Sequence, residues 1–157
     1  MTKRFDPELV DAMWRAIDLT RAYLLGDSRR IALYLADLET SRLPHVLAWL
    51  LLEHDQHLDR LGGPTMNVQL IDTVAAAAPL EVEFEVTAAV RRVAAKEVRL
   101  TQALEDLERP LNQVHAITIY TAAMMAEGYG RDAAVQQLDH DAAGYELIGY
   151  PRPYPIP

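Results

Sequence analysis

Cysteine is absent from this chain of 157 residues, and serine occurs only twice, as Ser28 and Ser41. Without thiols the chain can form no disulfide, no thiolate metal site and no cysteine nucleophile. No Gly-x-Ser-x-Gly motif is present, and both serines lie at expected helix boundaries, which disfavours serine-nucleophile catalysis. The glycine-rich loops that bind nucleotide phosphates, Gly-x-Gly-x-x-Gly and Gly-x-x-x-x-Gly-Lys, are missing as well.

Basic residues are outnumbered by acidic ones. The chain has 15 Lys and Arg against 23 Asp and Glu, for a net charge of −8. Because nucleic acids and anionic lipids bind basic surfaces, this balance predicts no nucleic-acid partner. The apolar runs are too short to span a bilayer, so we expect no membrane partner and a soluble, cytoplasmic protein.

Helical spacing dominates the pattern of apolar residues, which make up 50% of the chain. Asp6-Pro7-Glu8 is typical of a helix start, and Gly62-Gly63-Pro64 of a helix end. This pattern predicts an all-α single domain over residues 1–150, a bundle of six or seven helices. The remaining segment, 151–157, has proline at every second position and is predicted to be an extended tail.

Residues 80–86 read Leu-Glu-Val-Glu-Phe-Glu-Val, an alternation that is typical of a strand. The apolar positions that follow keep a helical period, and a single strand has no evident partner. We therefore favour one long central helix from about 81 to 108. Two loosely similar helical hairpins, over 19–38 and 119–138, are expected on either side of it.

Two polar residues fall on apolar stripes. His54 interrupts the stripe of the helix that begins near residue 43, and Glu97 interrupts that of the long helix. A buried carboxylate is costly unless it is paired. We therefore predict that His54 and Glu97 form a buried polar pair, which would be either structural or the floor of a pocket.

The segment Glu53-His54-Asp55-Gln56-His57 is the densest group of potential metal ligands. Imidazole and carboxylate groups suit zinc, manganese or iron, so His54, Asp55 and His57 are candidate ligands of a metal-dependent hydrolase. The stretch from Ala48 to Asp55 resembles the central signature of HD-domain phosphohydrolases, an all-helical family. That resemblance implies metal binding by His54 and Asp55, although His45, the only histidine upstream, lies on the same predicted helix instead of an earlier one.

Three aromatic residues, Trp14, Tyr23 and Trp49, lie off the main apolar stripes and are candidate interface residues. Our main functional hypothesis is thus a non-catalytic helical protein, without a cofactor, that binds a protein partner or a second copy of itself. The metal-dependent hydrolase is one alternative. The other is a bundle that binds a small apolar ligand, for which Met124 and Met125 beside Tyr120 and Tyr129 offer a lining.

Overall fold

The structure, a computed structural model, describes residues 6–156. Within that range the chain forms eight α-helices and one short 3-10 helix, and no strand, which confirms the predicted all-α class. No helix in this part of the chain is long and apolar enough to cross a membrane. The elements are α1 (Pro7–Leu25), α2 (Ser28–Ala36), η1 (Thr40–Arg42), α3 (Leu43–Leu61), α4 (Val68–Ala75), α5 (Leu80–Ala94), α6 (Leu100–Leu107), α7 (Pro110–Tyr129) and α8 (Arg131–Leu147).

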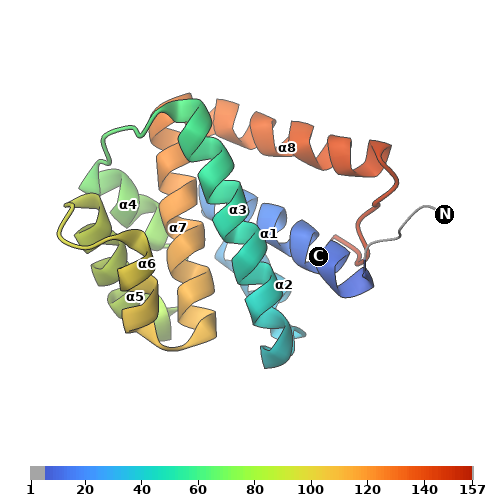
Figure 1. Ribbon diagram of the computed structural model, residues 1–157, viewed down its shortest axis with the longest axis horizontal. Helices are drawn as coiled ribbons and strands as arrows, with labels where there is room; N and C mark the ends of the chain where they lie inside the picture. The colour runs from blue at the N-terminus through green and yellow to red at the C-terminus, as the bar shows by residue number, and fades with distance from the viewer. Residues whose placement is uncertain (1–5, 157) are drawn as a thin grey trace.

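Helix α7 is the centre of the bundle (Figure 1). It packs against α1, α3, α4, α5, α6 and α8. Its middle portion from Val114 to Met125 is buried on almost every side, with only Tyr120 partly exposed. A helix that is apolar all round must be covered all round, because any exposed face would leave apolar surface in water. The six helices packed against α7 supply that cover.

The predicted long helix over 81–108 is wrong, because the chain forms two helices there. Helix α5 ends at Ala94 and α6 begins at Leu100. Lys96 has a φ of 60°, and the amide of Glu97 donates to the carbonyl of Arg92 at 3.0 Å. This is the geometry of a Schellman helix end, in which the left-handed residue is usually glycine. A lysine in that position gives no sequence signal for the break.

Residues 80–86 form the first two turns of α5, so the helical interpretation of this segment is correct. Val82, Val86 and Val90 are buried at helical spacing. The intervening acidic residues at 81, 83 and 85 gave the strand-like alternation, and two of them lie in the first turn of the helix. Acidic side chains are favourable there because the helix dipole is positive at its N-terminus.

Helix α1 carries three buried charged residues, Asp11, Arg15 and Asp18. Arg15 Nε donates to Asp11 Oδ1 at 2.6 Å, and its Nη1 donates to Asp37 Oδ1 at 3.0 Å and to the carbonyl of Tyr34. Arg42 Nη2 lies 3.0 Å from Asp11 Oδ1. These contacts join α1 to the end of α2 and to the start of α3.

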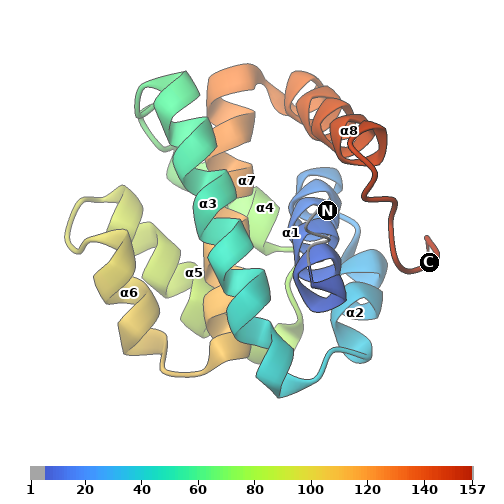
Figure 2. The same cartoon turned by 45° about the vertical axis from the view of Figure 1, so that its right-hand side comes forward.

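The C-terminal tail packs on α1. Arg152 donates to both carboxylate oxygens of Asp18, at 3.0 and 2.9 Å, and the hydroxyl of Tyr154 donates to the same carboxylate at 2.6 Å. The indole of Trp14 donates to the carbonyl of Tyr150 at 2.9 Å. The described tail residues 151–156 form neither helix nor strand and bend at Pro153 and Tyr154, and Figure 2 shows them beside α1 and α2.

We expect the contact between Arg152 and Asp18 to hold the tail. The substitution Arg152→Met would leave the Asp18 carboxylate, which is 5% exposed, without its cation. The free energy of unfolding should then fall by about 2 kcal/mol, measured by urea denaturation at neutral pH.

The matched control for this variant is Arg21→Met. It breaks a similar arginine–aspartate pair, to Asp139, whose side chains are 33% and 53% exposed. Exposed pairs contribute little, so the control should change the free energy of unfolding by less than about 0.5 kcal/mol. Equal effects of the two substitutions would contradict the anchoring role of Arg152.

Candidate functional site

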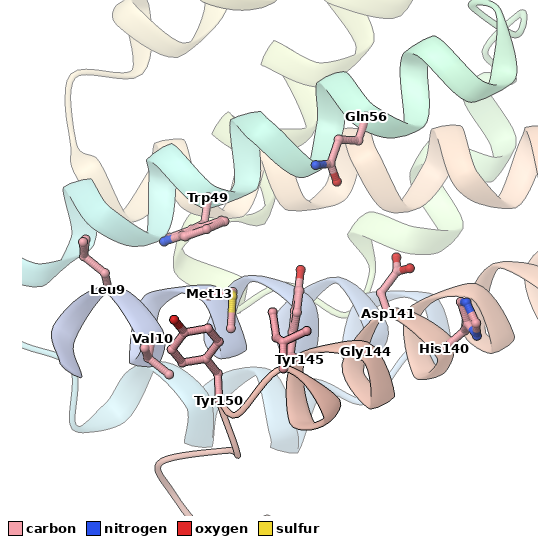
Figure 3. Close-up of a pocket in the computed structure, with 11 residues that line it drawn as sticks. Leu9, Val10, Met13, Trp49, Gln56, His140, Asp141, Gly144, Tyr145 and Tyr150 are labelled. Carbon is pink, nitrogen blue, oxygen red and sulfur yellow. The ribbon is translucent and has the colours of Figure 1, made fainter. Parts of the chain in front are cut away.

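A cleft of about 430 Å³ lies between α1, α3 and α8. Its walls are mainly apolar and come from three helices and the segment after α8 (Figure 3). The lining residues are Leu9, Val10, Met13, Trp49, Gln56, His140, Asp141, Gly144, Tyr145, Ile148 and Tyr150.

The two ends of the cleft differ in polarity. Leu9 and Val10 of α1 lie at one end, near Trp49 and Tyr150, whereas Asp141 and His140 lie at the other (Figure 3). The carboxylate of Asp141 points from α8 toward α3. The cleft therefore has an aromatic, aliphatic end and a polar end.

Glu53 of α3 lines a small extension of the cleft. This extension, of about 20 Å³, shares Met13, Trp49, Gln56 and Tyr145 with the main cleft. Burial raises the pKa of Glu53 to about 8; the hydrogen bond from Thr20 opposes this rise, and the nearby charges of Asp141 and Asp18 add to it. The carboxyl group is thus mostly protonated at neutral pH.

The hydrogen bonds of Glu53 are consistent with a neutral carboxyl group. Thr20 Oγ1 lies 3.2 Å from Glu53 Oε2 and 2.9 Å from the carbonyl oxygen of Ala16. A hydroxyl group has one hydrogen, which cannot be donated fully to both acceptors. When Thr20 donates to Ala16, a protonated Glu53 can donate to the Thr20 oxygen in return.

Tyr145 lies on the wall of the cleft, near enough to Glu53 and Asp141 for the charges of both to act on its hydroxyl. Burial, together with the charges of Glu53 and Asp141, raises the pKa of its hydroxyl to about 12. Its ring packs edge-on against Trp14, with 5.7 Å between the ring centroids. Tyr145 is therefore an uncharged, well-supported wall residue.

The predicted buried pair of His54 and Glu97 does not form. His54 is 6% exposed, but the Glu97 side chain is 62% exposed and lies 3.7 Å from Arg92. The prediction failed because Glu97 follows the end of α5 and does not continue its apolar stripe. The two residues do line one common cavity of about 450 Å³, together with Tyr120.

The three candidate metal ligands do not converge. His54 Nδ1 lies 2.9 Å from Asp55 Oδ1, whereas His57 Nδ1 lies 3.1 Å from the hydroxyl of Tyr129. Within residues 6–156 no group of three His, Cys, Asp or Glu side chains is placed to hold a metal ion. The buried His54 Nε2 has no hydrogen-bond partner. The metal-dependent hydrolase stays a prediction.

The three candidate interface residues have different environments. Trp14 and Tyr23 lie in the core and are 0% and 1% exposed. Their prediction as interface residues is therefore wrong. The hydroxyl of Tyr23 is 2.7 Å from His115 Nδ1, which satisfies it inside the bundle. Trp49 is half-buried on the wall of the cleft.

Met124 and Met125, expected beside a ligand pocket, are 1% and 0% exposed and do not line the cleft. Most of the residues that line the cleft are not predicted by the sequence. The sequence indicates Glu53 only as a member of the group of potential metal ligands, and Tyr145 is not among the residues that it singles out. The one signal that could have located the cleft is Trp49, an aromatic residue off the main stripe of its helix.

The raised pKa of Glu53 predicts how stability depends on pH. A glutamate in an unfolded chain has a pKa of about 4.3, whereas that of folded Glu53 is about 8. Between these values the folded state holds a proton that the unfolded state has lost, so stability falls as the pH rises. Relative to Glu53→Gln, which does not titrate, the wild-type free energy of unfolding should fall by about 1 kcal/mol per pH unit from about pH 5 to pH 8.

The measurement is urea denaturation of both proteins across this range of pH. His57 and His115, whose pKa values burial lowers, are common to both proteins, so the difference between the two profiles isolates Glu53. Parallel profiles would show that Glu53 is ionised in the folded protein at neutral pH.

Comparisons of the chain with models of protein families, with curated proteins and with solved structures find no significant match.

Proposed function

We propose that this protein binds a small, largely apolar ligand in the cleft between α1, α3 and α8. The observation that carries the proposal is the cleft itself, a cavity of about 430 Å³ with aromatic and aliphatic walls and a few polar groups at one end. Ligand sites commonly combine an apolar lining of this size with a small number of polar groups that set the ligand's orientation.

The position of Gly144 supports the proposal that the cleft binds a ligand. It lies inside α8 and lines the cleft, and a Cβ atom added there would meet nothing within 4 Å. A glycine inside a helix costs about 1 kcal/mol relative to alanine, and here neither a close contact nor a positive φ requires it. Its effect in the folded protein is to keep this wall of the cleft free of a side chain.

Filling the cleft should abolish binding. In Gly144→Phe the new ring would occupy the cavity without backbone strain, because Gly144 has helical geometry. We expect the wild-type protein to bind the neutral dye N-phenyl-1-naphthylamine saturably, with increased dye fluorescence and energy transfer from Trp49. The variant should bind it at least about tenfold more weakly.

The matched control is Ala143→Phe. Ala143 is exposed and adjacent on the same helix, so this variant adds the same ring outside the cleft. It should bind the dye like the wild type, and circular dichroism should show all three proteins folded. An absence of saturable binding, or equal binding by the wild type and Gly144→Phe, would overturn the proposal.

A second candidate function, self-association, is favoured by the outer face of α5. Leu80 and Phe84, one helical turn apart, are 87% and 89% exposed. The same face carries Thr87 and Arg91, and Arg91 is already paired with Asp72 of α4 at 2.8 and 2.6 Å. In a pair of α5 helices related by a two-fold axis, the contact would therefore be mainly apolar, made by Leu80 and Phe84 of each copy. Self-association through this face would form the homo-oligomer that the sequence analysis gave as one possibility.

Sedimentation of the wild type and of Phe84→Lys tests this surface. We expect a concentration-dependent dimer for the wild type and a monomer for the variant, because lysine removes apolar surface and adds charge at the centre of the contact. The control Leu147→Lys changes a residue that is also 87% exposed but lies on α8, and it should leave the dimer intact. A monomeric wild type at high concentration would rule out this candidate.

A further inference from the structure

The two half-buried acidic residues at the cleft, Glu53 and Asp141, differ from the buried acids of α1. Asp11 and Asp18 on α1 are each within 3.0 Å of arginine nitrogens. Glu53 and Asp141 have no ion pair with any described residue. Glu53 contacts the Thr20 hydroxyl, and Asp141 accepts a hydrogen bond from the Gln137 amide at 3.0 Å.

Among residues 6–156, no lysine or arginine lines the cleft or its extension. Among the titratable groups facing this space, α3 contributes Glu53, α8 contributes His140, Asp141 and Tyr145, and the segment after α8 contributes Tyr150. The nearby Asp18 of α1 is also acidic, although Arg152 pairs with it. The polar end of the cleft is therefore acidic, with Asp141 on its wall and the mostly protonated Glu53 in the extension beside it, and its opposite end is apolar.

We infer that the ligand is a lipophilic cation, an aromatic or aliphatic body with a protonated amine, whose charge is held by Asp141 at the polar end of the cleft, near Glu53 in the adjoining extension. This inference rests on the proposed function and specifies the ligand class. The apolar body would lie against Met13, Trp49 and Tyr150. The ammonium group would supply the opposite charge that neither acid receives from a described residue, and its approach would lower the pKa of Glu53 and so favour the ionised carboxylate.

The alternative occupants fit less well. An anionic ligand would place like charges together in a partly buried space, where repulsion is screened weakly by salt. A neutral ligand would bind the apolar end but would leave Asp141 without a counter-charge. Aromatic rings beside the cavity also favour cations, because the face of an indole or phenol ring carries negative potential.

Three naphthalene compounds that differ in charge provide the test. They are 1-naphthylmethylamine, a cation at neutral pH, 1-naphthalenemethanol, which is neutral, and 1-naphthoate, an anion. Titration calorimetry with the wild-type protein should show that the amine binds about tenfold more tightly than the alcohol and that the carboxylate binds most weakly.

Two variants locate the charge recognition. In Asp141→Asn and in Glu53→Gln the ratio of amine to alcohol affinity should fall, and in the double variant it should approach one. Asp139→Asn is the matched control, because Asp139 is an exposed acid on α8 that does not line the cleft and pairs with Arg21. It removes the same formal charge and should keep the preference for the amine.

The outcomes separate this inference from the proposed function. If the alcohol binds and Gly144→Phe prevents it, but the amine binds no better, then the cleft is a ligand site and the cationic ligand class is wrong. If none of the three compounds binds the wild type, the proposed function fails. If the control Asp139→Asn loses the preference as strongly as Asp141→Asn, overall charge and not the cleft explains it.

Discussion

A buried charge needs an opposite charge, and this requirement organises one side of the molecule. Asp11, Arg15 and Asp18 lie along α1 in the core, where an unpaired ion would cost several kcal/mol. Their partners come from distant parts of the chain: Asp37 at the end of α2, Arg42 before α3, and Arg152 in the tail. Satisfying three charges on one helix thus fixes where α2, α3 and the C-terminus must lie.

The same contacts create the cleft. Arg152 and Tyr154 bring the tail back to α1, and Trp14 binds the carbonyl of Tyr150. Tyr150 is thereby held as a wall residue at the apolar end (Figure 3). Helix α8 packs on α7 and α1 but leaves a gap beside α3, where Gly144 has no side chain to fill it. The ion pairs of α1 therefore also hold in place the tail segment that forms one wall of the cleft.

The sequence predicted the helical class well because proline, glycine and apolar spacing act locally. Asp6 caps α1 through the amide of Glu8, and Gly26 and Gly62 end their helices in the left-handed conformation that glycine favours. The break after Ala94 was missed because Lys96 adopts that same conformation without being glycine. That single error also misplaced Glu97, since a residue beyond the end of a helix no longer belongs to its buried stripe.

The site was harder to predict, for a different physical reason. His54 and Glu53 are adjacent in sequence, and histidine on an apolar stripe is the more conspicuous of the two. Which of them faces the cleft between α1, α3 and α8 depends on the helices packed against α3: His54 lies near Tyr120 of α7, and Glu53 lies near Thr20 of α1. Long-range packing of this kind leaves no periodic signal in the sequence. Only Trp49 gave a sign of this packing, because it is an aromatic residue that lies off the main apolar stripe of its helix.

Glu53 and Asp141 lack the stabilising ion pairs that the buried acids of α1 form with described arginine residues. An arginine near Glu53 would allow its carboxyl group to ionise, as happens for Asp18 on the neighbouring helix. Without one, burial keeps Glu53 protonated at neutral pH and leaves its region less stable as the pH rises. Acidic side chains with a shifted pKa and no paired cation are more common at functional sites than in structural cores. A binding site for a cation has to leave its acids unpaired, because a guanidinium group already in place would compete with the ligand for the same oxygens.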